Sequence, residues 1–321
     1  MIFSILWLVV GLAAILLGAN LLTDGSSAIA RRFGLSDLVV GLTVVAFGTS
    51  TPELVISIMS ALQGSAAIAV GNVVGSNIFN ILVIIGITAM IRPIKIERSV
   101  MCNEIPMVVL SSLILLVLGT QSFLDSGSAD TITRCQGIFL LIFFLLFMRY
   151  TLAQARTQPA GNEKTQEKPP MGFPKAILWV GLGLAGLIWG GDRFVDGATG
   201  IAKGFGVSDA VIGLTVVAIG TSLPELAASV VAACKNMPGL AVGNVIGSNI
   251  FNILLVLGSA SVIKPLPFSG IGVFDLSVLL YASIIFLVFG WFFRKREITR
   301  AEGTIMFLSY IAYTVFLIRN L

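Results

Sequence analysis

Residues 41–81 of this chain occur twice. The segment is repeated without a gap at residues 213–253, and 26 of the 41 positions are identical between the two copies. Both copies carry Gly-Thr-Ser-x-Pro-Glu followed by Gly-Asn-x-x-Gly-Ser-Asn-Ile-Phe-Asn, so oxygen-bearing side chains recur inside otherwise apolar sequence. A duplication of this length predicts two halves of similar structure that contribute the same polar side chains.

The composition indicates that these halves lie in a membrane. Hydrophobic residues make up 56% of the chain, charged residues only 11%, and the mean hydropathy is +1.00, whereas soluble domains carry roughly 25% charged residues. A helix needs about 20 apolar residues to cross the hydrocarbon core of a bilayer. We expect the first helix to end between Asn20 and Gly25, where polar residues begin. The sequence predicts an all-α polytopic membrane protein with about ten transmembrane helices, over residues 2–22, 38–62, 67–90, 102–119, 132–150, 173–192, 209–234, 239–262, 271–292 and 303–319.

Several classes of site are excluded by what the chain lacks. It contains no histidine, and Cys102, Cys135 and Cys234 show no paired spacing. Zinc and copper sites use histidine and cysteine ligands, so neither a transition-metal site nor a disulfide framework is expected. No cofactor is expected. An enzyme is disfavoured, because no nucleophile triad is present and the duplication would require two active sites.

A polar, proline-rich segment separates the two copies and carries too little apolar sequence to fold alone. We expect a first repeat over residues 1–150, a linker over 151–172 and a second repeat over 173–321, with five helices in each repeat. Because five is odd, consecutive repeats must enter the membrane from opposite sides. The sequence therefore predicts two inverted five-helix repeats, an arrangement found in many secondary transporters.

The distribution of basic residues predicts the orientation. If the N-terminus lies outside, 15 of the 20 Lys and Arg residues fall on the inner side, in agreement with the positive-inside rule. The linker is then cytoplasmic and both termini face out, in the plasma (inner) membrane of a prokaryote. This bias accounts for the net charge of +4, so the lipid bilayer is the expected partner and nucleic acid is not.

Each copy carries a glutamate after a proline near the middle of an apolar span. Pro52 and Pro224 remove a backbone hydrogen bond and break the helix, which frees carbonyl groups at Gly48 and Gly220. The glutamate that follows each proline costs at least about 2.5 kcal/mol near the bilayer centre, and neither span contains a Lys or Arg to pair with it. The pattern indicates a cation pathway. The two glutamates are Glu53 and Glu225.

Other oxygen-bearing side chains recur at helical spacing around these glutamates. Asn77 and Asn249 lie off these rows, and for them we expect hydrogen bonds between packed helices. Small-xxx-small patterns, Gly71 with Gly75 and Gly243 with Gly247, predict a close helix approach that brings the two rows together. The rows are Thr49, Ser50, Glu53 and Ser57 with Asn72, Ser76 and Asn80 in the first copy, and Thr221, Ser222, Glu225 and Ser229 with Asn244, Ser248 and Asn252 in the second.

Carboxylates, amides, hydroxyls and carbonyls together form a ligand set for a hard cation. Ca²⁺ takes six to eight such oxygens in adaptable geometry. Two carboxylates are neutralised by one Ca²⁺ or by two Na⁺, so the two ions should compete for one cavity. A third Na⁺ on the neutral ligands would make the exchange electrogenic.

The paired GTSxPE and GNxxGSNIFN segments resemble the two alpha-repeats of the sodium/calcium exchanger family, within the cation/calcium antiporter superfamily, and most of all its prokaryotic ten-helix members. The resemblance implies alternating access and ions bound at a midplane site shared by both repeats. Several branches of the family have Asp where this chain has Asn252, so two formal charges remain in place of three, which disfavours potassium dependence. The ligand set implied is Thr49, Ser50, Glu53, Ser76, Asn80, Thr221, Ser222, Glu225 and Ser248, with the backbone carbonyls of Ala46 and Ala218; Asn252 completes it as the counterpart of Asn80.

The resulting hypothesis is a secondary antiporter in which sodium entry drives calcium out. Proton/calcium exchange is an alternative within the same superfamily, because two neighbouring carboxylates raise each other's pKa and titrate as a pair. A cation channel could also use rings of oxygen ligands. The inverted duplication favours the antiporter.

Overall fold

The computed structural model describes residues 2–125, 129–157, 171–205, 218–292 and 296–319. Within these ranges, eight helices are long and apolar enough to cross a membrane, and a ninth candidate span is a helix pair bent by 44°. The nine coincide with nine of the ten predicted spans. The tenth, 209–234, is described only from Ala218 onward. The predicted all-α membrane fold is confirmed.

Two helices are longer than their apolar runs. Helices α1 (Ile2–Phe33) and α11 (Phe173–Gly204) have 32 residues each, so the prediction that the first helix ends between Asn20 and Gly25 is wrong. The helix continues because its polar residues find partners. Thr23 Oγ1 donates to the Ala19 carbonyl at 2.7 Å, and Lys235 Nζ lies 2.9 Å from an Asp24 carboxylate oxygen.

The chain divides into two compact units, and each takes segments from both copies of the repeat. Unit 1 comprises Met1–Thr49 and Tyr150–Val245, and unit 2 comprises Ser50–Arg149 and Ile246–Leu321. Of the predicted linker, residues 151–157 continue helix α10 and residues 158–170 lie outside the described ranges. Besides α1 and α11, the elements of unit 1 are α2 (Asp37–Val40), η1 (Gly41–Val45), α3 (Ala46–Thr49), α13 (Ala218–Thr221), α14 (Leu223–Cys234) and the first part of α15 (Pro238–Ile250).

Unit 2 contains most of the remaining helices and all four short strands of the described residues. Its π-helical turns η2 and η4 continue the helices that precede them, so Ala66–Ile91 and Pro238–Ile263 are single spans. The elements are α4 (Thr51–Leu62), α5 (Ala66–Phe79), η2 (Asn80–Ile85), α6 (Gly86–Ile91), β1 (Ile94–Lys95), α7 (Arg98–Cys102), α8 (Glu104–Leu118), α9 (Gln121–Leu124), β2 (Thr131–Ile132), α10 (Arg134–Thr157), η4 (Phe251–Leu257), α16 (Gly258–Ile263), β3 (Leu266–Pro267), α17 (Val273–Phe292), β4 (Glu297–Ile298) and α18 (Arg300–Arg319).

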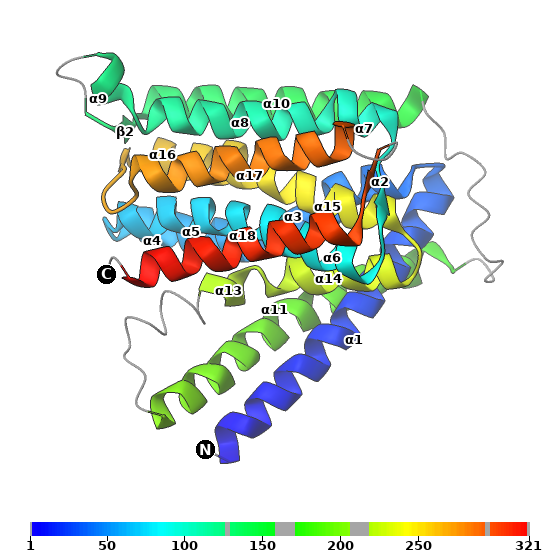
Figure 1. The fold of residues 1–321 in the computed structure, drawn as a ribbon. Helices are drawn as coiled ribbons and strands as arrows, with labels where there is room; N and C mark the ends of the chain where they lie inside the picture. Colours follow the sequence, from blue (N-terminus) through cyan, green and yellow to red (C-terminus); the bar gives the residue numbers. More distant parts are fainter. Residues whose placement is uncertain (1, 126–128, 158–170, 206–217, 293–295, 320–321) are drawn as a thin grey trace. The chain divides into compact units, whose positions relative to one another are not determined.

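In unit 1, α1 packs along α11 (Figure 1). Glycines allow the two backbones to approach closely, because a Cβ atom added at Gly18 would lie only 2.8 Å from the Gly183 carbonyl oxygen. Gly25 faces Ala176 while Gly11 faces Phe194, so the helices run antiparallel. They are equivalent helices of the two repeats, and antiparallel packing is what inverted repeats require.

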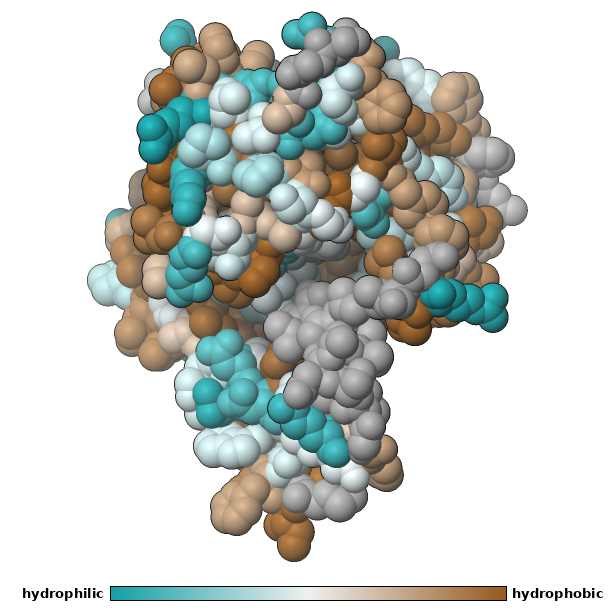
Figure 2. Space-filling view, turned by 90° about the vertical axis from the view of Figure 1, so that its left-hand side faces the viewer, coloured by the Kyte–Doolittle hydropathy of each residue, from teal (hydrophilic) through white to brown (hydrophobic). Residues whose placement is uncertain are grey.

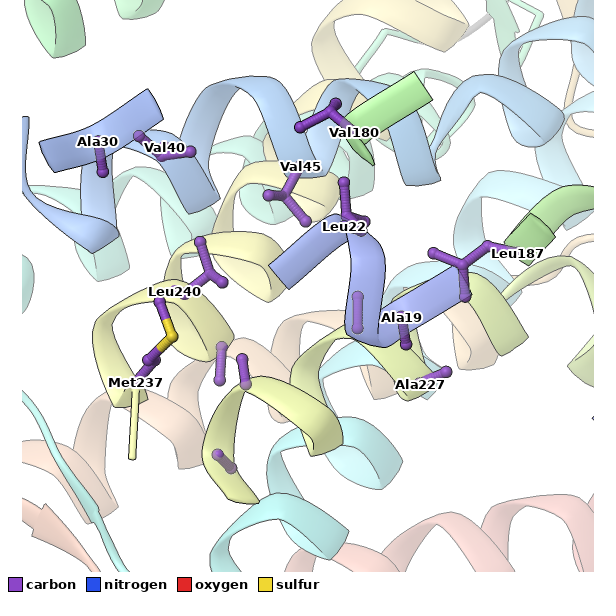
Figure 3. Close-up of a cluster of buried hydrophobic side chains, with 14 of the residues drawn as sticks. Ala19, Leu22, Ala30, Val40, Val45, Val180, Leu187, Ala227, Met237 and Leu240 are labelled. Atoms are coloured by element: carbon purple, nitrogen blue, oxygen red, sulfur yellow. The ribbon is translucent and has the colours of Figure 1, made fainter. Parts of the chain in front are cut away.

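An apolar cluster in unit 1 joins this helix pair to the helices of the duplicated segments (Figure 3). Leu22 of α1 and Leu187 of α11 are fully buried in it. Val45 of η1 and Leu240 of α15 belong to the same cluster, as do small residues such as Ala227 of α14. The cluster therefore fixes α14 and α15 against α1, and α14 carries one of the two glutamates.

In unit 2, short strands of the first repeat pair with short strands of the second. Strand β1 of the first repeat pairs antiparallel with β4 of the second, with Ile94 opposite Ile298. Strand β2 of the first repeat pairs in the same way with β3 of the second, with Ile132 opposite Leu266. Strand β1 is equivalent to β3 in the other repeat, and β4 is equivalent to β2, so the two pairs are equivalent to each other. This equivalence indicates an internal two-fold relation between the repeats in unit 2.

Helix packing in unit 2 shows the same two-fold relation between the repeats. A Cβ atom at Gly86 of α6 would lie 2.9 Å from the Gly303 carbonyl oxygen of α18, and a Cβ atom at Gly137 of α10 would lie 2.9 Å from the Gly258 carbonyl oxygen of α16. The motif Thr-Arg-x-x-Gly carries both Gly137 and Gly303. The α18 contact with α6 is thus the counterpart of the α10 contact with α16.

Much of the surface is apolar, as expected for a protein surrounded by lipid. Hydrophobic residues, coloured brown, cover large parts of the face shown in Figure 2. Large side chains such as Leu17, Leu145 and Leu308 are more than half exposed. Such side chains project from predicted spans into what would be the hydrocarbon region.

Candidate functional site

The first glutamate lies at the start of a helix that follows a break. Helix α3 ends at Thr49 and α4 begins at Thr51, with a bend of 44° between the two helices. Pro52 occupies the first turn of α4, where its missing N–H costs nothing. Glu53 follows in that turn and is fully buried. The proline thus starts a second half-helix, and the predicted break is confirmed for this copy.

A hydrogen-bonded brace in unit 2 holds α4 against α5. The Asn72 amide nitrogen donates to the Glu53 backbone carbonyl at 3.4 Å and to Ser57 Oγ at 3.2 Å. Ser57 Oγ in turn donates to the Ala69 carbonyl at 3.4 Å. Ser76 Oγ donates to a carboxylate oxygen of Glu53 at 3.5 Å. The glutamate row and the Ser/Asn row predicted from the sequence therefore meet.

Unit 1 contains the same brace at the second copy. The Asn244 amide nitrogen donates to the Glu225 carbonyl at 3.2 Å and to Ser229 Oγ at 3.0 Å. Ser229 Oγ donates to the Ala241 carbonyl at 3.4 Å. Glu225 is fully buried and lies in the first turn of α14, with Pro224 before it. Both copies therefore fold in the same way around their glutamate.

The end of α3 supplies further oxygen atoms in unit 1. Thr49 Oγ1 donates to the Asn244 amide oxygen at 3.1 Å and lies 3.5 Å from the Ala46 carbonyl oxygen. The last carbonyls of a helix lack intrahelical N–H partners, and carbonyls at a half-helix end bind sodium in other transporters. Ala46 and Thr49 are fully buried. In the second copy, Ala218 and Thr221 are the first and last residues of α13, and Thr221 is half-buried.

Several of the predicted ligands carry buried polar atoms with no hydrogen-bond partner among the described residues. Leaving such an atom unsatisfied costs about 1–3 kcal/mol, so each calls for an explanation. Hydroxyls outside the two motifs, such as those of Ser26 and Thr88, share this property. Among the predicted ligands the atoms are both amide atoms of Asn80, the hydroxyls of Ser222 and Ser248, and the amide oxygen of Asn252.

The side chain of Asn77 makes the hydrogen bonds between helices that the sequence predicts for it, and Asn249 takes part through its backbone carbonyl. Asn77 Nδ2 on α5 donates to the Asn249 backbone carbonyl on α15 at 3.1 Å. The Asn252 amide nitrogen, one turn further on, donates to Asn77 Oδ1 at 3.0 Å. These contacts join the two repeats inside unit 2. Both helices change there to π-helical turns, which occur often at functional sites.

The small-residue pattern of the second copy also produces a close approach, although to a different partner. A Cβ atom at Gly243 would lie 2.5 Å from the Leu38 carbonyl oxygen and 3.1 Å from the Gly41 Cα. Gly243 therefore packs on α2 and η1, while Asn244 makes the contact with the glutamate helix. For Gly71, the equivalent partner would be residues 209–217, which lie outside the described ranges.

The predicted ligands are divided between the two units. In unit 2, Ser76 donates a hydrogen bond to Glu53, and Asn252 donates one to Asn77. Ser50 directly precedes α4. Asn72 and Asn244, which belong to the polar rows, have a specific structural role, because each donates a hydrogen bond to the backbone carbonyl of a glutamate. The signal for that role was their recurrence in both copies. The predicted ligands of unit 1 are Ala46, Thr49, Ala218, Thr221, Ser222 and Glu225, and those of unit 2 are Ser50, Glu53, Ser76, Asn80, Ser248 and Asn252.

The donor set of the described residues is made of oxygen. No group of three or more His, Cys, Asp or Glu side chains that could hold a metal ion occurs in the described ranges. Cys102, Cys135 and Cys234 are free and exposed. Carboxylate, amide, hydroxyl and carbonyl oxygens suit Na⁺ and Ca²⁺.

Comparisons with known proteins agree with this chemistry. The family model of the sodium/calcium exchanger protein matches residues 3–153 and 175–319. The chain is 38% identical over 327 residues to the putative antiporter CaxA of Alkalimonas amylolytica, with 98% of each chain covered. It is 32% identical over 348 residues to the sodium/calcium exchanger MaX1 of Methanosarcina acetivorans, again with 98% of each covered. A solved structure of the sodium-calcium exchanger NCX_Mj, soaked with Na⁺ and Ca²⁺, superimposes with a TM-score of 0.82 at 32% identity and 97% coverage of both chains.

Proposed function

Because the chain belongs to the sodium/calcium exchanger family, we propose that it is a secondary antiporter that exchanges sodium for calcium across the membrane. Members of this family are membrane transporters of these two ions, and the fold has the repeated halves of a helical exchanger. In the proposed reaction, sodium moves inward and calcium outward by alternating access. The ions are substrates, and the reaction needs no cofactor.

The observation that carries the proposal is the duplicated glutamate. Glu53 and Glu225 are each fully buried in the first turn of a helix that follows a break, and each is braced through its backbone by an asparagine. A carboxylate at such a depth is costly unless it meets a cation or lines a pathway. Building this arrangement twice argues for an ion-binding role.

The charge of the proposed ligands limits which ions can bind together. Two carboxylates are balanced by one Ca²⁺ or by two Na⁺, so binding of one ion excludes the other. Competition of this kind is the requirement for exchange, since a carrier that holds both ions at once would not couple their movement. The neutral oxygens complete the coordination shell, which for Ca²⁺ contains six to eight oxygen atoms.

The proposed ligands are the twelve residues that the sequence predicts. Their support is the burial of most of their side chains and the unsatisfied oxygen atoms of several of them. We further propose a prokaryotic plasma membrane location, with both termini outside and the segment between the repeats in the cytoplasm. The ligands are Ala46, Thr49, Ser50, Glu53, Ser76, Asn80, Ala218, Thr221, Ser222, Glu225, Ser248 and Asn252.

The test is sodium-dependent uptake of ⁴⁵Ca into vesicles that contain the purified protein. Wild-type vesicles loaded with sodium should take up calcium when diluted into sodium-free buffer. The double variant Glu53→Gln with Glu225→Gln should show no uptake above protein-free vesicles, because both negative charges are gone. Persistent uptake by the double variant would exclude these glutamates as the ion ligands.

A matched control is the buried Glu302 of α18. Its carboxylate accepts hydrogen bonds from the backbone N–H and hydroxyl of Thr299. In the other repeat Gln136 accepts the same backbone bond from Thr133, so Glu302→Gln reproduces a natural arrangement and should retain uptake.

An imposed proton gradient replaces the sodium gradient in a parallel assay, and uptake driven by protons alone would identify a proton/calcium antiporter.

A further inference from the structure

Three asparagines of unit 2 form a hydrogen-bonded chain between the repeats. Asn77 Nδ2 donates to the backbone carbonyl of Asn249 at 3.1 Å. Asn77 Oδ1 accepts from the amide nitrogen of Asn252 at 3.0 Å. All three side chains are buried, with exposed fractions of 0% for Asn77, 1% for Asn249 and 0% for Asn252.

The chemistry of this chain fixes the orientation of each amide. A backbone carbonyl can only accept a hydrogen bond, so the Asn77 nitrogen must face Asn249 and the Asn77 oxygen must face the other way. That oxygen can only accept, so Asn252 must turn its nitrogen toward Asn77. The amide oxygen of Asn252 is therefore the atom left over, and it is buried with no hydrogen-bond partner among the described residues.

The sequence-equivalent residue in the first repeat is held differently. Asn80 occupies the position of Asn252 in the other copy and is also fully buried. Neither its amide nitrogen nor its amide oxygen has a hydrogen-bond partner in the described part of the chain. The two repeats otherwise make matching contacts in unit 2, as the strand pairs do. Among the described residues, Asn252 therefore has a hydrogen bond from its amide nitrogen that Asn80 lacks.

We propose that Asn77 is a positioning residue for ion binding, which fixes Asn252 with its amide oxygen free to bind the transported cation. The proposal rests on the proposed function, since it takes Asn252 as an ion ligand. An amide that nothing holds in place can turn its NH₂ group toward the cation, and the partial positive charge of that group repels the ion. Asn77 prevents that orientation for Asn252, whereas no residue in the described ranges holds the amide of Asn80.

Partners that orient a metal ligand typically contribute 10–100-fold to metal affinity. Asn77→Ala should therefore weaken Ca²⁺ binding about tenfold at constant ligand number. The decisive readout is the coupling between Asn77 and Asn252. Once Asn252→Ala has removed the ligand, Asn77 has nothing to orient, so adding Asn77→Ala should change the Kd by less than about twofold.

The experiment is calcium titration by calorimetry on the purified full-length protein in sodium-free detergent solution. Wild type, Asn77→Ala, Asn252→Ala and the double variant form the first double-mutant cycle. Asn80→Ala, Asn249→Ala and their double variant form a matched control cycle at the equivalent positions. The Asn249→Ala change keeps the backbone carbonyl that Asn77 binds, so the control leaves the chain to Asn252 in place.

Coupling in the first cycle and additivity in the control cycle support the proposal. Additive effects of Asn77→Ala and Asn252→Ala overturn it, because Asn77 would then act only through helix packing. Equal coupling energies in the two cycles overturn the proposal as well, since Asn80 would then depend on Asn249 as strongly as Asn252 depends on Asn77. An Asn252→Ala variant that binds Ca²⁺ with wild-type affinity overturns it directly.

Folding and function are controlled separately. Asn77→Ser keeps a polar group that is too short to reach both partners, so it replaces Asn77→Ala in the cycle if that variant elutes as an aggregate on size exclusion. Calorimetry detects binding whether or not sodium drives transport. A failure of the cycle with intact sodium-driven uptake therefore rejects the positioning role alone, whereas uptake by the Glu53→Gln, Glu225→Gln variant rejects the proposed function.

Discussion

At the scale of single residues, the side chain of Asn244 makes three hydrogen bonds in unit 1. Its amide binds the Glu225 carbonyl, Ser229 Oγ and Thr49 Oγ1. Asn244→Ala should lower the free energy of unfolding by roughly 1–3 kcal/mol, because these buried groups lose their partner. Thermal unfolding in detergent measures the loss. Ser229→Ala removes one of these three bonds and the bond to the Ala241 carbonyl, but leaves those to Glu225 and Thr49. An equal loss of stability in that variant would contradict the assignment.

Duplication made the polar residues of the site predictable. A single buried serine or asparagine is weak evidence of a ligand, because it often bonds to its own helix, but recurrence of Glu53 and its neighbours in a second copy removes most of that ambiguity. The partners of Asn72 and Asn244 could not be predicted in the same way. An amide can donate or accept, and its choice of a backbone carbonyl depends on where the helix breaks.

At the scale of secondary-structure elements, the glycines of α11 differ in what surrounds them. A Cβ atom at Gly183 would lie 2.5 Å from the Leu22 amide nitrogen, whereas a Cβ atom at Gly181 would meet nothing within 4 Å among the described residues. Gly183→Ala should therefore destabilise the protein by roughly 1–3 kcal/mol through overpacking against α1. The control, Gly181→Ala, should stabilise it by up to about 1 kcal/mol, because alanine favours the helix.

Melting temperatures of the two variants, measured in the same detergent, decide between these signs. Similar shifts for both would show that the seam between α1 and α11 tolerates a methyl group. A lower melting temperature for Gly183→Ala alone would establish that the close approach of these equivalent helices holds unit 1 together.

Apolar runs predicted the presence of the helices better than their ends. The apolar runs of α1 and α11 end at residues 22 and 192, yet both helices continue. Beyond those ends, Asp24 pairs with Lys235 and Asp196 pairs with Arg193. A span predicted from the length of an apolar run ends at the first charged residue, even where the folded protein provides an ion-pair partner for that charge. The two-residue strands were not predictable either, since they are too short to show a period-two pattern.

At the scale of the whole molecule, an odd number of spans per repeat predicted the inverted arrangement. The composition of the two units was not predictable, because each unit combines segments from both copies and the sequence gives no indication of which equivalent helices pack together. Strand pairing in unit 2 adds support for the proposed topology. Residues 94–95 and 297–298 are both assigned to the inner side, and they pair, as do residues 131–132 and 266–267 on the outer side.

The three exposed cysteines allow the proposed orientation to be tested with native residues. Cys102 ends α7 and Cys135 follows the start of α10, with the span of α8 between them, so they should lie on opposite sides of the membrane. In variants that keep one cysteine and replace the others by serine, a membrane-impermeant maleimide should label Cys135 in intact cells. Cys102 and Cys234 should react only after permeabilisation, which also controls for reactivity. Labelling of Cys102 and Cys135 from the same side would contradict the odd helix count on which the inverted repeats depend.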